Sequence, residues 1–214
     1  MSRGLFITFE GPDGSGKTTQ IDRLEAFIIN KGYDAVLTRE PGGTKIGEKI
    51  REIILDKNNT EMEYMTEALL YAAARAQHVS QVIKPALEEG KMVICDRFMD
   101  SSIAYQGFGR GLGDSVRVIN EYAVNGCFPD ITFLLKLDPE IGKIRIKVED
   151  RDRLELEKLE YHKVVFRAYE ELEKLYPERI IGIDANRSID EISNEIQFHI
   201  EGLMDKKNID LLGE

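Results

Sequence analysis

Apolar residues along the chain follow two patterns: short unbroken runs, and longer stretches in which they recur every three or four positions. The short runs predict strands buried in a sheet. We expect these strands at residues 4–10, 35–38, 92–95, 131–137 and 180–183. The longer stretches predict amphipathic helices that pack one face against the core. We expect these helices at residues 17–31, 45–55, 61–89, 114–125, 155–176 and 188–204.

Two local features refine the helices. Pro85 lies inside the helix expected at 61–89 and should bend it near its end, because proline lacks the N–H that a helix requires. Asp114 is expected to cap the helix at 114–125. The apolar face of the 61–89 helix is predicted to consist of Met65, Leu69, Ala72 and Ala76.

Strands alternate with helices along the chain, without internal repeats or low-complexity linkers. This order is typical of a doubly wound α/β domain with a parallel sheet. We therefore expect one domain over residues 1–214, in which a five-stranded parallel sheet has helices on both faces, a three-layer fold. Ligands of such sheets bind at the carboxyl ends of the strands. The first residues to consider are Gly11 onward, Arg39, Asp96, Arg97 and Asp138.

The first of these positions carries a phosphate-binding motif. Residues 11–18, GPDGSGKT, match G-x-x-x-x-G-K-[ST] between a predicted strand and a predicted helix. Such a loop turns its backbone N–H groups toward an anion at the helix N-terminus. Lys17 would reach the β- and γ-phosphates, and the Thr18 hydroxyl would bind a magnesium ion. The alternative, a glycine-rich turn that binds nothing, is disfavoured by the strand and helix on either side.

Charge and cysteine content limit the possible partners. The net charge of −10, from 29 basic and 39 acidic residues, argues against a nucleic acid or an anionic membrane surface. Cys95 and Cys127 show no disulfide or zinc spacing, so each is expected to be reduced and buried. The first apolar run is about half as long as a signal-peptide core, and no later segment approaches a membrane span. We expect a cytoplasmic protein.

Further candidates follow the third strand and lie in loops. Asp96 directly follows a buried strand, where it would hold magnesium through water, although an N-cap or a salt bridge is the alternative. A single surface arginine is usually only solvated, but several at converging loops favour a phosphate site. The loop arginines are Arg39, Arg97, Arg110, Arg151 and Arg153.

Two observations separate kinases from other P-loop proteins. A guanine-reading N-K-x-D is missing, since the nearest match, residues 30–33, reads NKGY at the end of a helix. Tyr71 and Arg75 are four residues apart on a predicted helix and so share one face. The pair could stack on a planar base and donate to its carbonyl, although an aromatic ring packed on an arginine stem is the more common arrangement.

Four sequence blocks together resemble the thymidylate kinase family in order and spacing. They are FEGPDGSGKTTQ at 9–20, REPGGT at 39–44, DRFMDSSIAYQG at 96–107 and DRLE at 152–155. The resemblance covers nearly the whole chain and implies the P-loop nucleoside-monophosphate-kinase-like fold. It implies transfer of the γ-phosphoryl of MgATP to dTMP, giving dTDP and ADP for dTTP synthesis, by a homodimer.

The resemblance also implies the residues that bind dTMP. Tyr71 matches the ring that stacks on thymine, and Arg75 the donor to the carbonyl at position 4, where cytosine carries an amino group. Ser102 matches a polar position near the base edge. Tyr105 matches the ring under the sugar that disfavours a 2′-hydroxyl, and Gln106 matches a further position in the substrate pocket.

At the phosphate end, Arg97 resembles the arginine that binds the acceptor 5′-phosphate and bridges toward the donor. Asp13 is similar to the carboxylate that touches the 3′-hydroxyl and helps to place the metal. Arg39 belongs to the block that lines the acceptor phosphate, and the 40–41 peptide bond is expected to be cis. The implied ATP-binding residues are Gly11, Pro12, Asp13, Gly14, Ser15, Gly16, Lys17, Thr18 and Thr19, and the implied metal ligands are Thr18 and Asp96.

The lid is expected at about residues 142–155. Some family members carry an arginine in the P-loop where this chain has Gly14, so the sequence resembles the bacterial type, in which a lid arginine supplies the charge. Arg153 is the matching residue, with Arg151 and Lys147 as alternatives. The resemblance thus makes Lys17, Asp13, Arg97 and Arg153 the catalytic residues, and residues 184–187 the loop beside the adenine.

Two other functions are compatible with the P-loop alone. One is a kinase for another nucleoside monophosphate, such as UMP or dUMP. The other is a nucleotide-driven switch that hydrolyses ATP without an acceptor. The switch has no use for the pair Tyr71 and Arg75 or for the 96–107 block.

Overall fold

The computed structural model describes residues 3–145 and 152–207, and its center is a five-stranded parallel sheet. The strands lie in the order β2-β3-β1-β4-β5, so that β1 has β3 on one side and β4 on the other. Every neighbouring pair is parallel, as the alternation of strands and helices predicts. The strands are β1 (Phe6–Glu10), β2 (Ala35–Arg39), β3 (Met92–Asp96), β4 (Ile131–Lys136) and β5 (Ile180–Asp184).

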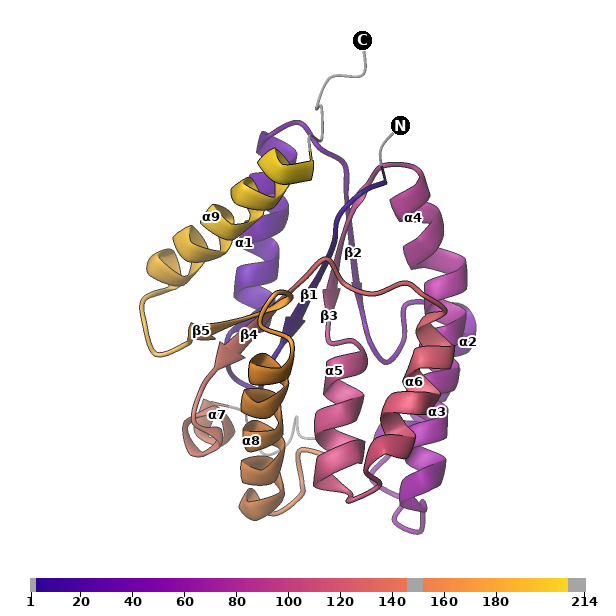
Figure 1. Cartoon of the computed structure of the whole chain (residues 1–214). Helices are drawn as coiled ribbons and strands as arrows, with labels where there is room; N and C mark the ends of the chain where they lie inside the picture. The colour runs from indigo at the N-terminus through magenta and orange to yellow at the C-terminus, as the bar shows by residue number, and fades with distance from the viewer. Residues whose placement is uncertain (1–2, 146–151, 208–214) are drawn as a thin grey trace.

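Helices cover both faces of this sheet and confirm the three-layer fold. On one face α1 and α9 pack together against the sheet, and Figure 1 shows them side by side. On the other face residues 79–87, α8 and the segments between β3 and β4 form a second core, against which Tyr71 of α3 packs. The helices are α1 (Lys17–Asn30), α2 (Lys45–Leu55), α3 (Tyr64–His78), α4 (Lys84–Glu88), α5 (Met99–Ser102), α6 (Asp114–Val124), α7 (Pro139–Arg145), α8 (Leu159–Leu175) and α9 (Ile189–Lys207).

Successive side chains of β1 point to opposite faces of the sheet and so contribute to both cores. Ile7 and Phe9 face the core under α1 and α9, whereas Phe6 faces the opposite core. Thr8 follows Phe6 on that second face and pairs with the hydroxyl of Thr132 on β4 at 2.7 Å. Glu10 comes next on the same face and is fully buried. The sequence thus places a carboxylate inside the protein immediately before the P-loop.

The helix predicted at 61–89 differs from the structure in two respects. It begins at Tyr64, and a π-helical segment, Val79–Ile83, separates α3 from α4. This wider turn lies directly before Pro85, where the missing N–H and the ring disfavour a regular α-helical turn. A second π-helical segment, Ile103–Gly109, follows α5.

The apolar face predicted for this helix is largely wrong. Met65 and Leu69 are 38% and 50% exposed, and only Ala72 of the four predicted residues is buried. The buried face instead carries polar residues, among them Arg75 and His78, that are hydrogen-bonded inside the protein. Apolar periodicity cannot detect a core face made in part of paired polar side chains.

Two further boundaries are corrected. Gly113, with a φ of +62°, precedes α6, so Asp114 is the first residue of that helix instead of its cap and pairs with Arg117. Helix α8 begins at Leu159 and not at 155, because the Asp152 carboxylate accepts from the backbone N–H groups of residues 154 and 155 and so forms a turn.

Both cysteines are buried and free. Among the described residues, no helix combines the length and apolar character that crossing a membrane requires.

Candidate active site

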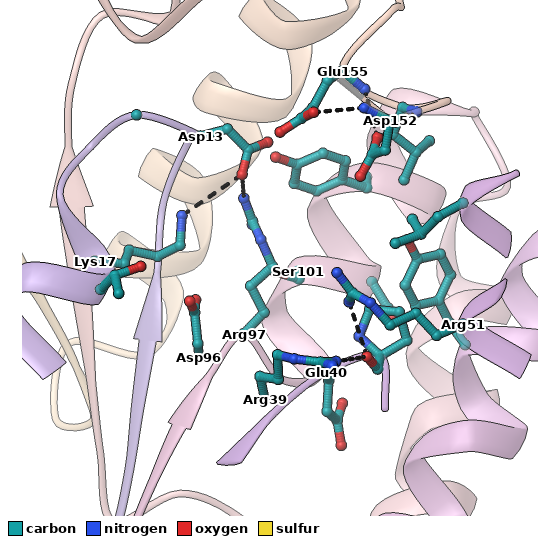
Figure 2. A pocket seen from close by; sticks show the side chains of 18 of the residues that line it. Asp13, Lys17, Arg39, Glu40, Arg51, Asp96, Arg97, Ser101, Asp152 and Glu155 are labelled. Carbon is teal, nitrogen blue, oxygen red and sulfur yellow. Dashed lines mark hydrogen bonds and ion pairs between the residues drawn. The ribbon is translucent and has the colours of Figure 1, made fainter. Parts of the chain in front are cut away.

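A cavity of about 480 Å³ lies at the carboxyl ends of β1, β2 and β3 (Figure 2). Its walls combine the P-loop, the turn after β3, one face of α3 and residues at the end of the predicted lid. The lining residues are Asp13, Gly14, Gly16, Lys17, Thr18, Thr19, Arg39, Glu40, Pro41, Arg51, Leu55, Tyr71, Arg75, Asp96, Arg97, Ser101, Ser102, Tyr105, Gln106, Asp152, Leu154 and Glu155. Gly11, Pro12, Ser15 and Arg153, which the sequence predicted for the site, do not line it.

The P-loop is held by close backbone contacts that require glycine. Gly11 has a φ of +130°, and a Cβ there would lie 2.5 Å from the Leu135 carbonyl oxygen of β4. Gly14 has a φ of +77°, and its Cβ would lie 2.5 Å from the carbonyl oxygen of Gly142 in α7. A side chain at either position would clash with backbone atoms. The loop is therefore packed between the sheet and the start of the predicted lid.

Two cations meet the Asp13 carboxylate in the cavity. Arg97 donates to Asp13 Oδ1 at 2.6 Å, and Lys17 Nζ lies 3.8 Å from the same oxygen (Figure 2). Burial raises the pKa of Asp13, but Arg97 and then Lys17 outweigh it and bring this pKa to about 2. Burial, and next the charge of Arg97, lower the pKa of Lys17. Asp13 thus stays ionised at neutral pH and holds two positive groups together.

The backbone of Arg97 is in an unusual conformation, which neighbouring groups support. Its φ is +65°, in a region that residues other than glycine rarely adopt. Glu10 Oε1 accepts from the N–H groups of Phe98 and Ser101 at 2.8 and 3.2 Å, which fixes the turn that follows. Arg97 also donates to the hydroxyls of Ser101 and Tyr169 at 3.1 and 3.3 Å. The guanidinium is therefore aimed at the cavity by groups that lie behind it.

Glu10 is the center of this support. Its second oxygen accepts from the hydroxyls of Ser101 at 2.5 Å and Tyr169 at 2.9 Å. Burial, and next the negative charge of Asp100, raise the pKa of Glu10 to about 7. The carboxyl joins β1, the turn after β3 and α8, so the position of Arg97 depends on three elements that are distant in sequence.

Asp96 fits the predicted contribution to a magnesium site. It lines the cavity near Lys17, and its Oδ1 is buried with no hydrogen-bond partner in the described part of the chain (Figure 2). A buried carboxylate oxygen without a partner is costly unless a ligand or water satisfies it. No group of three or more His, Cys, Asp or Glu residues gathers around a possible ion within residues 3–145 and 152–207. This donor set suits magnesium bound mainly by phosphate oxygens and water.

At the other end of the cavity the predicted base-binding residues come together. Tyr71, Arg75, Ser102, Tyr105 and Gln106 all line it. The Arg97 guanidinium lies over the ring of Tyr105, 5.2 Å from its centroid. Gln106 Nε2 donates to Glu67 at 2.9 Å, so its amide is already oriented. Arg75 is only 2% exposed and, unlike a typical surface arginine, is held by hydrogen bonds on several sides.

Two arginines converge between the two ends of the cavity. Arg39 donates to the Pro41 carbonyl oxygen at 2.9 Å, and Arg51 of α2 donates to the same oxygen at 3.0 Å. The Glu40–Pro41 peptide bond is cis, as expected. Arg51 was not among the residues predicted from the sequence. The sequence held only a weak indication of Arg51. It lies four residues after Gly47 and four before Leu55, so the three share one face of α2, and Arg51 and Leu55 line the cavity.

The predicted lid cations occupy other places. Arg153 donates to Glu67 Oε2 at 2.5 Å and to the Ile54 carbonyl oxygen at 2.9 Å. Glu67 is fully buried and also binds Arg110. Arg145, at the end of α7, donates to the Gly14 carbonyl oxygen in the P-loop at 3.0 Å. Lys147 and Arg151, the two alternatives, lie outside the described residues.

Asp152 and Glu155 are further lining residues that the sequence analysis did not assign. Glu155 Oε2 accepts from the Asp152 N–H at 2.7 Å, and Figure 2 shows the Glu155 carboxyl pointing toward Asp13. Burial, and then the charges of Asp152 and Asp13, raise the pKa of Glu155, although the Asp152 N–H lowers it. Both residues belong to the DRLE block at 152–155, in which a role was predicted only for Arg153.

The strand order, the P-loop between β1 and α1, and one cavity that extends from the P-loop to Tyr71 and Arg75 define the class of nucleoside-monophosphate-kinase-like P-loop proteins. Within that class, residues 9–196 match the family model for thymidylate kinase. The chain belongs to the thymidylate kinase family.

Individual relatives agree with the family match. The chain is 52% identical over 194 residues to the thymidylate kinase of Geobacillus sp. (strain WCH70), a match that covers 89% of this chain and 92% of the relative. It is 49% identical over 201 residues to the thymidylate kinase of Clostridium novyi, a match that covers 92% of this chain and 98% of the relative. The crystal structure of thymidylate kinase from Ehrlichia chaffeensis superimposes with a TM-score of 0.75 at 33% identity, over 92% of this chain and 99% of that one.

Proposed function

We propose that this protein transfers the γ-phosphoryl group of ATP to dTMP, giving dTDP and ADP. The observation that carries this proposal is one cavity with a P-loop at one end and the pair Tyr71 and Arg75 at the other, with Arg97 between them. A nucleotide switch would need only the first of these ends. Membership of the thymidylate kinase family supports the same substrate pair.

Catalysis in this cavity is alignment and charge stabilisation. The acceptor oxygen of dTMP is already an anion near neutral pH, so no general base is needed. Lys17 would bind the β- and γ-phosphates, and Arg97 would bring the acceptor phosphate into line with the γ-phosphorus. Both cations would stabilise negative charge on the transferring oxygens. Asp13 orders the two cations before substrate arrives, because it already pairs with both.

Recognition of thymine would use the opposite end of the cavity. Tyr71 provides a ring for stacking, and Arg75 provides a donor to the carbonyl oxygen at position 4. Cytosine has an amino group at that position, so its amino hydrogens would meet a buried donor and not an acceptor. Tyr105 would crowd the 2′ position of the sugar and favour deoxyribose.

A coupled assay of ADP release tests this function directly. With ATP fixed, dTMP, dUMP, UMP, CMP and dCMP are offered separately as acceptors. We expect the highest kcat/KM with dTMP and a low rate with dCMP. A preference for UMP would refute the argument from Tyr105, and ATP turnover that does not depend on dTMP would identify a switch.

Magnesium is expected to assist phosphoryl transfer by neutralising the donor phosphates. Thr18, through its hydroxyl, and Asp96, through bound water, would hold the ion. We expect Asp96→Asn to raise the magnesium concentration for half-maximal rate about tenfold, because the partnerless Oδ1 loses its charge. A magnesium titration of the same assay measures this value. An unchanged midpoint, with a folded variant, would leave Asp96 as a structural residue only.

A homodimer is proposed from the exposed apolar face of α3. Met65 and Leu69 are exposed there, and α3 packs against α2 and α6, which leave Ile53 and Tyr122 exposed. We expect Leu69→Glu to shift the protein toward monomer, because a charge would be buried in the interface. Sedimentation velocity measures the shift, with Phe198→Glu as a control at an equally apolar but distant exposed site on α9. A wild-type monomer, or equal shifts in both variants, would contradict the assignment.

A cytoplasmic location is proposed on two grounds, the free state of Cys95 and Cys127 and the nucleotide substrates of the proposed reaction. Cell fractionation followed by immunoblotting tests this location.

A further inference from the structure

A buried chain of hydrogen bonds leads from β2 to Arg75. Thr38 Oγ1 lies 2.6 Å from His78 Nε2, and His78 Nδ1 lies 2.9 Å from Glu40 Oε1. The other oxygen of Glu40 accepts from Arg75 Nε at 2.6 Å. Thr38 is half-buried, but His78 is completely buried and Glu40 is 4% exposed, so bulk water does not compete for the hydrogen bonds that Glu40 makes to His78 and Arg75. Arg75 and Glu40 line the cavity, whereas His78 lies behind them.

The direction of each hydrogen bond follows from the chemistry of the groups. An ionised carboxylate only accepts, so His78 Nδ1 donates to Glu40. His78 Nε2 accepts from the hydroxyl of Thr38 in the neutral imidazole and donates to it in the protonated one, and Nδ1 donates to Glu40 in both forms. The ring also packs on the backbone of Gly43, where a Cβ would lie 2.5 Å from His78 Nε2. Both ring nitrogens therefore have partners that fix the orientation of the ring.

The guanidinium of Arg75 uses nearly all of its donors on protein acceptors. An arginine side chain has five N–H donors. In Arg75, Nε donates to Glu40, the NH1 group donates to Ser102 at 2.9 Å and to Asn120, and the NH2 group donates to the Phe98 carbonyl oxygen at 2.9 Å. Within the part of the chain that the structure describes, these acceptors leave one hydrogen of NH2 for a ligand.

This arrangement explains why the orientation of Glu40 matters. A carboxylate beside an arginine commonly binds it through both oxygens. A bidentate pair with Arg75 would occupy Nε and a hydrogen of NH2, the group from which a base would have to accept. His78 prevents this pairing, because it holds the second oxygen of Glu40 on the far side.

We propose that His78 is a positioning residue for base recognition. By holding Oε1 of Glu40, it keeps one N–H of Arg75 available to a carbonyl oxygen of the pyrimidine. His78 does not touch the substrate and acts only through Glu40 and Arg75. This inference rests on the proposed function, in which Arg75 reads the carbonyl at position 4.

A matched pair of amide substitutions tests the proposal. The amide nitrogen of asparagine falls near the position of Nδ1 and can still donate to Glu40, whereas that of glutamine falls near Nε2 and cannot. We expect His78→Gln to lower the ratio of kcat/KM for dTMP over dCMP about tenfold, the size of one lost charge-assisted hydrogen bond. His78→Asn should keep the wild-type ratio. The KM for ATP should be unchanged in both variants. The kcat/KM for dUMP, which has the same carbonyl at position 4, should change by the same factor as that for dTMP.

A general loss of structure would give a different result. It would lower kcat/KM for all three monophosphates in step and would raise the KM for ATP. That outcome, or equal ratios in the two variants, would overturn the proposal. His78→Leu removes both hydrogen bonds and serves as a second variant, in which the ratio must fall at least as far as in His78→Gln. Failure of the proposed function would instead be visible in the wild-type protein, as a lack of preference for dTMP over dCMP.

Discussion

Replacing Arg97 by methionine is expected to lower kcat/KM for dTMP about a thousandfold, with most of the loss in kcat. Arg97 is the cation placed between the P-loop and the base-binding end, and it donates to Asp13 at 2.6 Å. A guanidinium that meets charge developing on the transferring phosphoryl group contributes several kcal/mol at the transition state. Steady-state kinetics with dTMP and ATP varied in turn measures both constants.

Two further variants control this experiment. Arg97→Lys keeps the charge but loses the planar fork, so we expect a rate between those of wild type and the methionine variant. Arg117→Met removes a half-exposed arginine on α6 outside the cavity and should leave kcat within twofold, about the scatter expected for a surface change. A loss in Arg97→Met that appears only as a higher KM would assign Arg97 to ground-state binding, and the proposed role in the transition state would be wrong.

Replacing Arg153 by alanine is expected to lower kcat about a hundredfold, if the lid arginine reaches the transferring phosphoryl group as the family resemblance implies. This role requires Arg153 to move from its place in the structure. Arg153 donates to Glu67 at 2.5 Å and does not line the cavity, so it must leave this carboxylate during the reaction. Glu67 would keep Arg110 and Gln106 as partners, which lowers the cost of that exchange. Single-turnover kinetics with both nucleotides bound measures the chemical step.

Arg110→Ala is the matched control, because Arg110 shares the carboxylate of Glu67 with Arg153. Loss of either arginine should lower the melting temperature by a similar amount, since each leaves a buried acid with fewer partners. Only Arg153→Ala should lower kcat. Equal kcat values in the two variants would assign Arg153 to the support of Glu67. The catalytic cation would then have to be sought elsewhere in the lid, and Arg145, which donates to the Gly14 carbonyl oxygen of the P-loop, is one described candidate.

The sequence predicted the sheet and the P-loop well because both depend on local patterns. Five apolar runs are strands in the structure, with ends that shift by about one or two residues, a shift typical of strand boundaries. Gly11 and Gly14 lie against backbone atoms that leave no room for a side chain, so these positions require glycine and the loop can be recognised from its sequence. The helix spacing that joined Tyr71 to Arg75 likewise placed both residues at one cavity.

Predictions failed where long-range contacts overrode the local pattern. The helix containing Met65 and Leu69 was expected to bury them, yet the protein buries Arg75 and His78 on that helix. Burial of these polar residues depends on Glu40, which lies about 35 to 40 positions away in sequence, a separation that helical periodicity does not report.

The sequence by itself determined the class of fold, the phosphate cradle and the family, because strand, helix and turn preferences and short motifs act over a few residues. The tertiary structure alone decided which charged groups meet: Glu67 with Arg153, Glu10 with the turn after Arg97, and His78 with Glu40. Their pairing is set by the packing of distant elements, where burial makes every unpaired charge costly and so selects one arrangement.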